Sequence, residues 1–500
     1  MALPDTTMTG AMNAEPSHSA GILTFRKVFP IVLLSMTFVL AVRQSTSLDP
    51  DLWWHLKAGE QIVQSKSVPH VDDFSFTKNG SEWVAHEWLS EVLLYGAYRL
   101  TGMVGLVTLF SLLIVGVYWM VYRRCEGRPY GASLAVLMGA AAASPLFGIR
   151  PQMLTLLLAA IYISLLEQFA RDGDRRHLYW LPPLMLLWVN LHAGFALGLA
   201  LIGLYMISVV LDGSWRKLAP LAIVLCIGVA LVPLNPNGFR MFSYPYETLT
   251  STSMAAFIEE WASPNFHKSM YLPLAILLFC TFAVLALTPR RVQNGELFLL
   301  LVTAFGALRS VRHIPIFTLI AVPIFARYLW TTIGSHGWDR WFTSTEQRPD
   351  TLKLIINVAL LLAVTTLAFS RIWTFAHHQR TYEEVRNPVA AVDFIKEQNL
   401  PGPIYNRYGW GGYLIYRLYP EYRVYIDGRA DVYGDQFFAE AMRVYDGLGD
   451  WPNSLDRFGI NTVLIAPDAA LASLLKNDSS KWKVVYEDDQ SIIFCRNSAP

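Results

Sequence analysis

Two aspartates separated by a single proline, Asp49 and Asp51, stand about seven residues after the first long apolar run of the chain. Trp53, Trp54 and His55 follow at once. Tryptophans mark the headgroup level of a membrane, and carboxylates are costly there unless water, a metal ion or a substrate meets them. This acidic motif is therefore the first place where chemistry is expected.

The two carboxylates can act in two ways. They can bind a divalent cation, or one of them can take a proton from an acceptor hydroxyl as a general base. The structural alternative is that Asp51 is the N-cap of a helix over residues 52–63. One aspartate can cap while the other does not, so we predict that Asp49 or Asp51 is catalytic. Whether a divalent metal ion is a cofactor stays open, with Asp49 and Asp51 as its ligands if it is.

Further cationic and imidazole side chains lie between apolar runs. Arginine binds phosphate bidentately and stays charged in a partly dehydrated site, so Arg150, Arg309 and Arg312 suit a lipid-linked phosphate. Snorkelling to headgroups is the alternative for each arginine. His86 and Glu87 either bind substrate or metal, or only interact with a helix dipole. The predicted substrate-binding residues are His55, His86, Glu87, Arg150, His192, Arg309, Arg312 and His313.

The composition indicates what must position these residues. The chain has 500 residues, of which 53% are hydrophobic and 16% charged, and its mean hydropathy is +0.34. Soluble globular proteins carry roughly 25% charged residues, so we expect a polytopic membrane protein. A net charge of +1 gives no basic field for nucleic acid. The four cysteines show no spacing typical of a metal site or a disulfide framework.

About eleven apolar runs approach the roughly 17 to 25 residues that a membrane-crossing helix needs. Several are short, so the number of spans is approximate. They cover residues 28–42, 103–121, 131–147, 153–168, 178–189, 195–211, 218–234, 271–288, 297–308, 314–333 and 354–370. We predict a mainly α-helical membrane domain over 28–370, preceded by a disordered cytoplasmic tail over 1–27.

The connecting loops fall into two alternating sets. The set that includes the N-terminal tail holds 15 Lys and Arg in 79 residues, and the other set, which includes the first long loop 43–88, holds 9 in 97. The positive-inside rule places the first set in the cytoplasm and the C-terminus on the outer side. Residues 148–152, 190–194 and 309–313 then each place a cationic or imidazole group at the outer mouth of the bundle. For His192 a purely structural role is the alternative.

Residues 371–500 are predicted to form an outer, periplasmic or extracytoplasmic α/β domain, because short strands and helices alternate there. We expect helices over 388–397, 436–445 and 469–475, and strands over 403–406, 423–427, 462–466, 482–486 and 491–495. Trp410, Asp427 and Arg429 are acceptor-side candidates. The alternative for them is a turn with packed aromatic side chains and an Asp427–Arg429 contact.

The acidic motif after the first span, the amphipathic segment 52–63 and the segment 86–102 that leads into the second span resemble the GT-C superfamily of polyprenol-dependent membrane glycosyltransferases. This superfamily includes protein mannosyltransferases, aminoarabinose transferases, Rgt-like enzymes and oligosaccharyltransferases. His86-Glu87-Trp88 stands where those families often carry Pro-Pro-Leu. The aromatic and glycine residues over 406–416 distantly resemble the motif by which outer domains of oligosaccharyltransferases contact the acceptor, although the acidic residue of that motif is absent.

The resemblance implies an enzyme of the cell (inner) membrane and cell envelope. It would transfer a sugar from a polyprenyl-phosphate donor to a glycan, lipid or protein acceptor on the outer face. Asp49 or Asp51 would be the catalytic residue of the acidic motif. The alternatives are a transporter or lipid flippase, for which ionisable groups near the middle of the membrane would be expected, and a non-catalytic envelope assembly protein.

Overall fold

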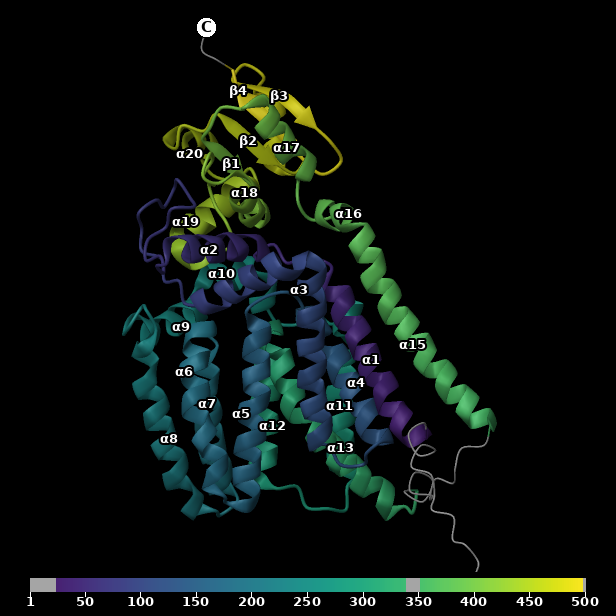
Figure 1. The fold of residues 1–500 in the computed structure, drawn as a ribbon. Coiled ribbons are helices and arrows are strands. Elements are labelled where there is room, and N and C mark those ends of the chain that lie inside the picture. Colours follow the sequence, from purple (N-terminus) through teal and green to yellow (C-terminus); the bar gives the residue numbers. More distant parts are fainter. Residues whose placement is uncertain (1–23, 339–350, 498–500) are drawn as a thin grey trace, which may run out of the picture.

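The computed structural model describes residues 24–338 and 351–497. Most of them form a bundle of helices, and a small domain of strands and helices stands on one end of it (Figure 1). Each of the predicted apolar runs falls on one helix of this bundle, in places with an adjoining 3-10 turn. These helices are α1 (Phe25–Ser45), α3 (Trp88–Arg124), α4 (Tyr130–Ala143), α5 (Gln152–Asp172), α6 (Leu181–Leu191), α7 (Phe195–Leu211), α8 (Leu218–Leu231), α11 (Leu272–Leu287), α12 (Asn294–Arg309), α13 (Ile314–Ser335) and α15 (Thr351–His377).

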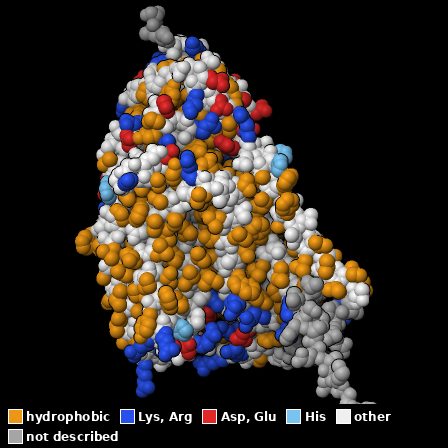
Figure 2. All heavy atoms as spheres, in the orientation of Figure 1, with side chains coloured by type: hydrophobic (Ala, Val, Ile, Leu, Met, Phe, Trp, Pro, Cys, Tyr) orange, Lys and Arg blue, Asp and Glu red, His pale blue; other side chains and the backbone are white. Residues whose placement is uncertain are grey.

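Seven of the described helices are long and apolar enough to cross a membrane: α1, α3, α5, α8, α11, α13 and α15, three of them counted with a 3-10 turn. Helices α4 and α7 are apolar but shorter. The space-filling view shows a broad hydrophobic band around the bundle, with charged side chains at both ends (Figure 2). The chain is therefore a multi-pass membrane protein, and the crossing of all eleven helices stays a prediction.

The start of α1 and the C-terminal domain lie at opposite ends of the bundle (Figure 1). At the end away from that domain, Lys and Arg side chains gather (Figure 2). They surround a cavity of about 1190 Å³ whose lining includes Arg123, Arg171, Arg290 and Arg291. This distribution agrees with the expected cytoplasmic location of that end, although the compartment of either terminus stays a prediction.

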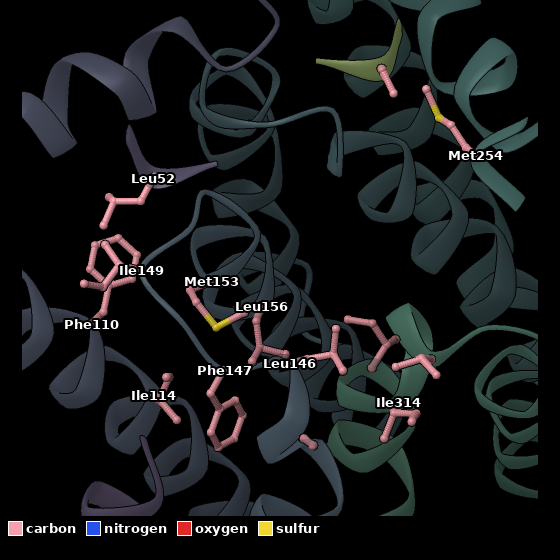
Figure 3. Close-up of a cluster of buried hydrophobic side chains, with 14 of the residues drawn as sticks. Leu52, Phe110, Ile114, Leu146, Phe147, Ile149, Met153, Leu156, Met254 and Ile314 are labelled. Atoms are coloured by element: carbon pink, nitrogen blue, oxygen red, sulfur yellow. The ribbon is translucent and has the colours of Figure 1, made fainter. Parts of the chain in front are cut away.

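Helix α13 lies at the centre of the bundle, because every residue from Ile314 to Ala326 is buried. Figure 3 shows part of the buried hydrophobic core, to which Phe110 and Ile114 of α3, Met153 of α5 and Ile314 of α13 contribute. Lipid tails are as apolar as these side chains, so close packing rather than removal from water must hold the helices together. The packed bundle gives the loops at its ends a fixed base.

Helix α2 (Leu52–Ser65) and the first part of α3 lie across the end of the bundle that carries the C-terminal domain (Figure 1). Gly102, with φ of 66°, breaks α3 between this crossing part and the membrane-spanning part, in a backbone region that favours glycine. Gly59 allows α2 to pack closely against α3, because a β-carbon at this position would fall 2.1 Å from the carbonyl oxygen of Glu91. The amphipathic helix predicted over 52–63 is thus present.

The C-terminal domain contains a four-stranded sheet in the order β1-β2-β4-β3. Strands β1 and β2 are parallel, and the β2–β4 and β4–β3 pairs are antiparallel. The strands are β1 (Ile404–Asn406), β2 (Thr462–Ile465), β3 (Trp482–Glu487) and β4 (Ile492–Arg496), and the helices are α16 (Gln379–Glu384), α17 (Val389–Gln398), α18 (Gly411–Leu418), α19 (Ala430–Tyr445), α20 (Trp451–Arg457) and α21 (Ala470–Asn477).

The strand predicted over 423–427 is wrong. Val424 makes only isolated bridges, to Ser75 and to Ile404. Its amide donates to the carbonyl of Phe74 and its carbonyl accepts from the amide of Phe76, at 3.0 and 3.1 Å. The extended segment therefore pairs with the loop after α2 instead of adding a strand to the sheet, and it joins the C-terminal domain to the bundle.

Candidate active site

The acidic motif lies at the junction of α1 and α2. The Asp51 amide donates to Oδ1 of Asp49 at 2.9 Å, and the indole N–H of Trp54 donates to Oδ1 of Asp51 at 3.2 Å. Asp51 stands at the N-cap position, but its side chain makes no capping hydrogen bond to α2. Both carboxylates are therefore free of the capping role that was the structural alternative.

Arg150, from the connection between α4 and α5, ties Asp49 to a third carboxylate. Its Nε lies 3.3 Å from Oδ2 of Asp49, and its two terminal nitrogens donate to Oε1 and Oε2 of Glu260 at 2.5 and 3.0 Å. Glu260 belongs to a 3-10 turn, η6 (Glu259–Trp261). Nε of Arg312 lies 3.6 Å from Oε2 of the same glutamate. Asp49, Asp51, Arg150, Glu260 and Arg312 thus form one group, called here the Asp–Arg–Glu cluster.

The charges in this cluster act differently on its carboxylates. Burial, together with the neighbouring charge of Asp49, raises the pKa of Asp51 to about 7 against the opposing effect of Arg150. Burial also acts to raise the pKa of Glu260, but the charge and hydrogen bonds of Arg150 outweigh it and hold that pKa below its usual value. Asp51 is thereby poised to exchange a proton near neutral pH, while Glu260 stays ionised.

The guanidinium of Arg150 occupies the place beside Asp49 where a metal cation could otherwise bind. It contacts Asp49 and forms a bidentate pair with Glu260. The charge of Asp49 and that of Glu260 raise the pKa of Arg150 further, although burial opposes them, so the side chain stays charged. A dication bound by Asp49 and Asp51 would face this guanidinium, and a metal role for the two aspartates stays a prediction.

A second group surrounds Glu87, the residue before α3. Nε2 of His55, Nε2 of His86 and Nε2 of His192 lie 3.7, 3.6 and 3.7 Å from its carboxylate oxygens. Nδ1 of His55 also lies 3.5 Å from Oε1 of Glu91. Four of the predicted substrate-binding residues, His55, His86, Glu87 and His192, are thus brought together in what is called here the imidazole cluster.

The segments that carry the imidazole cluster are fastened to one another. The indole N–H of Trp88 donates to Oδ1 of Asn190 at 2.9 Å, and the Ser90 hydroxyl donates to the carbonyl of Leu191 at 2.5 Å. The start of α3 is thereby held on the end of α6, next to His192. Tyr244 of α9 (Arg240–Thr250) covers the cluster, with its ring centroid 4.4 Å from that of His86.

Of the residues predicted in the loop 309–313, Arg309 and His313 lie apart from the Asp–Arg–Glu cluster, whereas Arg312 belongs to it. Arg309 is the last residue of α12 and is exposed, and none of the described ion pairs joins it to Asp49, Asp51 or Glu260. Arg312 instead lies in a 3-10 turn, η8 (Val311–His313), with its guanidinium 4.6 Å from the ring centroid of Trp261. His313 is half-buried, and its Nδ1 has no hydrogen-bond partner among the described residues.

The acceptor-side candidates hold the C-terminal domain in place. Asp427 accepts from Nε and Nη2 of Arg429 at 2.8 and 2.7 Å, and Nη2 also lies 2.7 Å from Asp72 of the loop after α2. The indole N–H of Trp410 donates to the carbonyl of Arg386 at 3.0 Å. These contacts agree with the packing role that was the alternative, including the Asp427–Arg429 contact.

Glycines of the C-terminal domain touch the acidic motif directly. A β-carbon on Gly412 would lie 2.6 Å from the carbonyl oxygen of Pro50, and one on Gly428 would lie 1.7 Å from Oδ1 of Asp51. These two glycines thus give the domain a close approach to Asp51. Asp435 of α19 adds a second attachment, since its carboxylate accepts from the hydroxyls of Ser251, Thr252 and Ser253.

Sequence reasoning missed Glu260 and Glu91. Glu260 lies in a long loop, 235–270, in the run Glu259-Glu260-Trp261. An acidic pair beside a tryptophan is the same signal that singled out Asp49 and Asp51, and it was available there. Glu91 lies on the face of α3 that α2 covers, and the sequence alone does not show that face.

Neither a family model nor a curated protein matches the chain. Among solved structures it resembles the archaeal oligosaccharyltransferase AglB from Archaeoglobus fulgidus, in complex with an inhibitory peptide and a dolichol-phosphate. The TM-score is 0.55 and the identity 10%, over 95% of this chain and 75% of that chain. The apo form of the Archaeoglobus fulgidus oligosaccharyltransferase is also similar, with a TM-score of 0.50 and 11% identity over 88% and 70% of the two chains. The chain therefore shares the fold of these oligosaccharyltransferase structures.

Proposed function

We propose that the chain is a membrane glycosyltransferase that moves a sugar from a polyprenyl-phosphate donor to an acceptor at the end of the bundle where the C-terminal domain stands. The observation that carries this proposal is the placement of Asp51. It is an aspartate with a pKa near 7, beside Arg150, in a fold shared with oligosaccharyltransferases. The AglB structure was solved with a dolichol-phosphate and an inhibitory peptide, which supports a lipid-linked donor and a peptide acceptor in general.

The reaction is a displacement at the anomeric carbon of the sugar. An acceptor hydroxyl or amide attacks that carbon, the bond to the phosphate oxygen breaks, and Asp51 takes the proton of the nucleophile. A general base works best with a pKa near the working pH, which Asp51 has and the ionised Glu260 lacks. Asp49 is then a positioning residue, because it holds the guanidinium of Arg150.

Arg312 is the group proposed to meet the leaving phosphate. Its guanidinium is part of the Asp–Arg–Glu cluster but, among the described residues, makes only one ion pair, at 3.6 Å to Glu260. Arg150, by contrast, is committed to two carboxylates. A guanidinium near a developing phosphate charge lowers the barrier, because it is already oriented when the charge forms. Arg309, which is exposed, is not assigned this role.

A transfer assay tests the proposal. The purified chain in lipid nanodiscs is given radiolabelled polyprenyl-phosphate sugars with a membrane extract as acceptor source, and released polyprenyl phosphate and labelled product are measured. We expect turnover with at least one donor and its loss in Asp51→Asn. Turnover that is equal in the wild type, Asp49→Asn and Asp51→Asn would remove the proposed base, and no binding or turnover of any polyprenyl-linked donor would reject the function.

A further inference from the structure

The imidazole cluster has the composition of a metal site. Nε2 of His86 and Nε2 of His192 approach different oxygens of the Glu87 carboxylate, at 3.6 and 3.7 Å. The donor atoms of these three residues all lie within 4.8 Å of one another. With a metal–nitrogen distance of about 2.0 to 2.1 Å, ligand atoms around tetrahedral zinc lie roughly 3.3 Å apart. Small side-chain movements therefore suffice to place all three on one ion.

The cluster also contains buried polar atoms without partners. Glu87 is 5% exposed, and its Oε2 has no hydrogen-bond partner in the described part of the chain. The same holds for Nδ1 of His55 and for both carboxylate oxygens of Glu91. An unpaired buried polar group destabilises the fold, so an arrangement with several of them is explained better by a missing partner than by packing.

The other ring nitrogens are held in a way that turns Nε2 toward Glu87. Nδ1 of His86 lies 3.2 Å from the carbonyl oxygen of Val84. Nδ1 of His192 lies 2.9 Å from the hydroxyl of Thr155, and the amide of Gly194 donates to the same nitrogen at 2.9 Å. Because the Gly194 amide donates to Nδ1, the proton of neutral His192 lies on Nε2. Binding a metal through Nε2 would require that proton to move to Nδ1, which would release the Gly194 amide and donate to the Thr155 oxygen instead. Such outer contacts typically orient metal-binding histidines.

We propose that His86, Glu87 and His192 bind a divalent transition-metal ion of the zinc class, with His55 beside them as a further nitrogen donor. Nitrogen and carboxylate ligands suit zinc and related ions. Glu91 is the positioning residue for His55, at 3.5 Å from its Nδ1. The site is separate from Asp49 and Asp51 and does not depend on the proposed glycosyl transfer.

Metal content tests the site directly. The chain is purified without a polyhistidine tag, stripped with a chelator, equilibrated with Zn²⁺ and analysed by inductively coupled plasma mass spectrometry. We expect one tightly held ion per chain in the wild type, and at least a tenfold weaker affinity in His86→Ala, His192→Ala and Glu87→Gln. His177→Ala is the matched control, because His177 lies in the loop between α5 and α6 and pairs with Asp172 at 2.9 Å. Equal zinc binding in all five proteins would overturn the proposal.

A milder variant distinguishes the loss of a metal contact from misfolding of the chain. Thr155→Val removes the oxygen that accepts the Nδ1 proton of His192 but leaves the ligands in place, and outer contacts of this kind are worth about 10- to 100-fold in metal affinity. We expect zinc affinity to fall by that factor with an unchanged gel-filtration profile, and unchanged affinity would contradict the assigned orientation of His192. Asp51→Asn should retain zinc while losing sugar transfer. The proposed metal site and the proposed glycosyl transfer can therefore fail independently. Loss of zinc in Asp51→Asn would show that the metal site is not separate from the acidic motif.

Discussion

Oδ1 of Asp51 lies against Gly428, so close that a β-carbon on the glycine would fall 1.7 Å from it. Asp51 begins the segment that lies across the bundle, and Gly428 belongs to the C-terminal domain. The proposed base, near the start of the chain, is thus covered by a domain at the other end of the sequence. Its burial, and with it the raised pKa, depends on this contact.

Gly428→Ala should therefore disturb the candidate active site without replacing a charged residue. Overpacking of this kind costs about 1 to 3 kcal/mol, so we expect a lower thermal unfolding temperature and loss of most transfer activity. Gly409→Ala is the matched control, since a β-carbon there has nothing within 4 Å. Wild-type activity and stability in Gly428→Ala would show that the domain does not close on Asp51.

The rate of sugar transfer should follow the ionisation of Asp51. Its pKa is raised to about 7, and a general base must be deprotonated to act. We expect kcat/KM to rise about tenfold per pH unit below pH 7 and to level off above it. Asp51→Asn should lose about 10²- to 10⁴-fold on the plateau above pH 7 and should lack the rise below it. The measurement is a pH–rate profile between pH 5 and pH 9. A flat profile in the wild type would assign the proton transfer elsewhere.

Arg312→Lys should weaken donor binding, because lysine keeps the charge but loses the planar fork that binds phosphate. The expected loss is about 1 to 3 kcal/mol, or on the order of ten- to a hundredfold in affinity. Arg309→Lys is the control: both residues come from the same short connection, but Arg309 is exposed. Titration of purified variants with a polyprenyl-phosphate sugar decides the point. Equal affinities in the two variants would remove Arg312 from the phosphate site.

The pair of Asp427 and Arg429 should stabilise the attachment of the C-terminal domain. Arg429 is 2% exposed, and removing one partner of a buried ion pair costs about 3 to 5 kcal/mol. We expect Arg429→Ala to release the domain to limited proteolysis at temperatures where the wild type resists. Arg457→Ala, which removes a half-exposed partner of Glu440, should have little effect. Equal protease resistance would contradict this role.

The same pair predicts how stability changes with pH. Burial acts to raise the pKa of Asp427, but Arg429 and Tyr433 outweigh it, and the pKa in the folded chain lies below the ordinary 3.8. A carboxyl group whose pKa is depressed on folding stabilises the fold above its unfolded pKa and loses that contribution as the pH falls through its folded pKa. Protease resistance should therefore decline below about pH 4 in the wild type and change less in Asp427→Asn.

The membrane helices could be predicted from the sequence, because a sufficiently long apolar run seldom forms anything else. The contacts between loops could not be predicted in this way. Arg150 and Arg312 were expected at the bundle mouth from the parity of the loops, yet their shared partner Glu260 was not. Arg309 was expected beside Arg312, but α12 extends through residue 309 and keeps that side chain outside. The segment 423–427 has strand-like residues, and its pairing with residues 74–76 arises only when the two domains meet.

The three hydroxyls at residues 251–253 that donate to Asp435 stand shortly before Glu260 in the same loop. The loop that supplies Glu260 and the domain that supplies Gly428 are thereby one mechanical unit. A displacement of the C-terminal domain would therefore move this loop as well, so the cover over Asp51 and the Glu260 partner of Arg150 depend on one attachment.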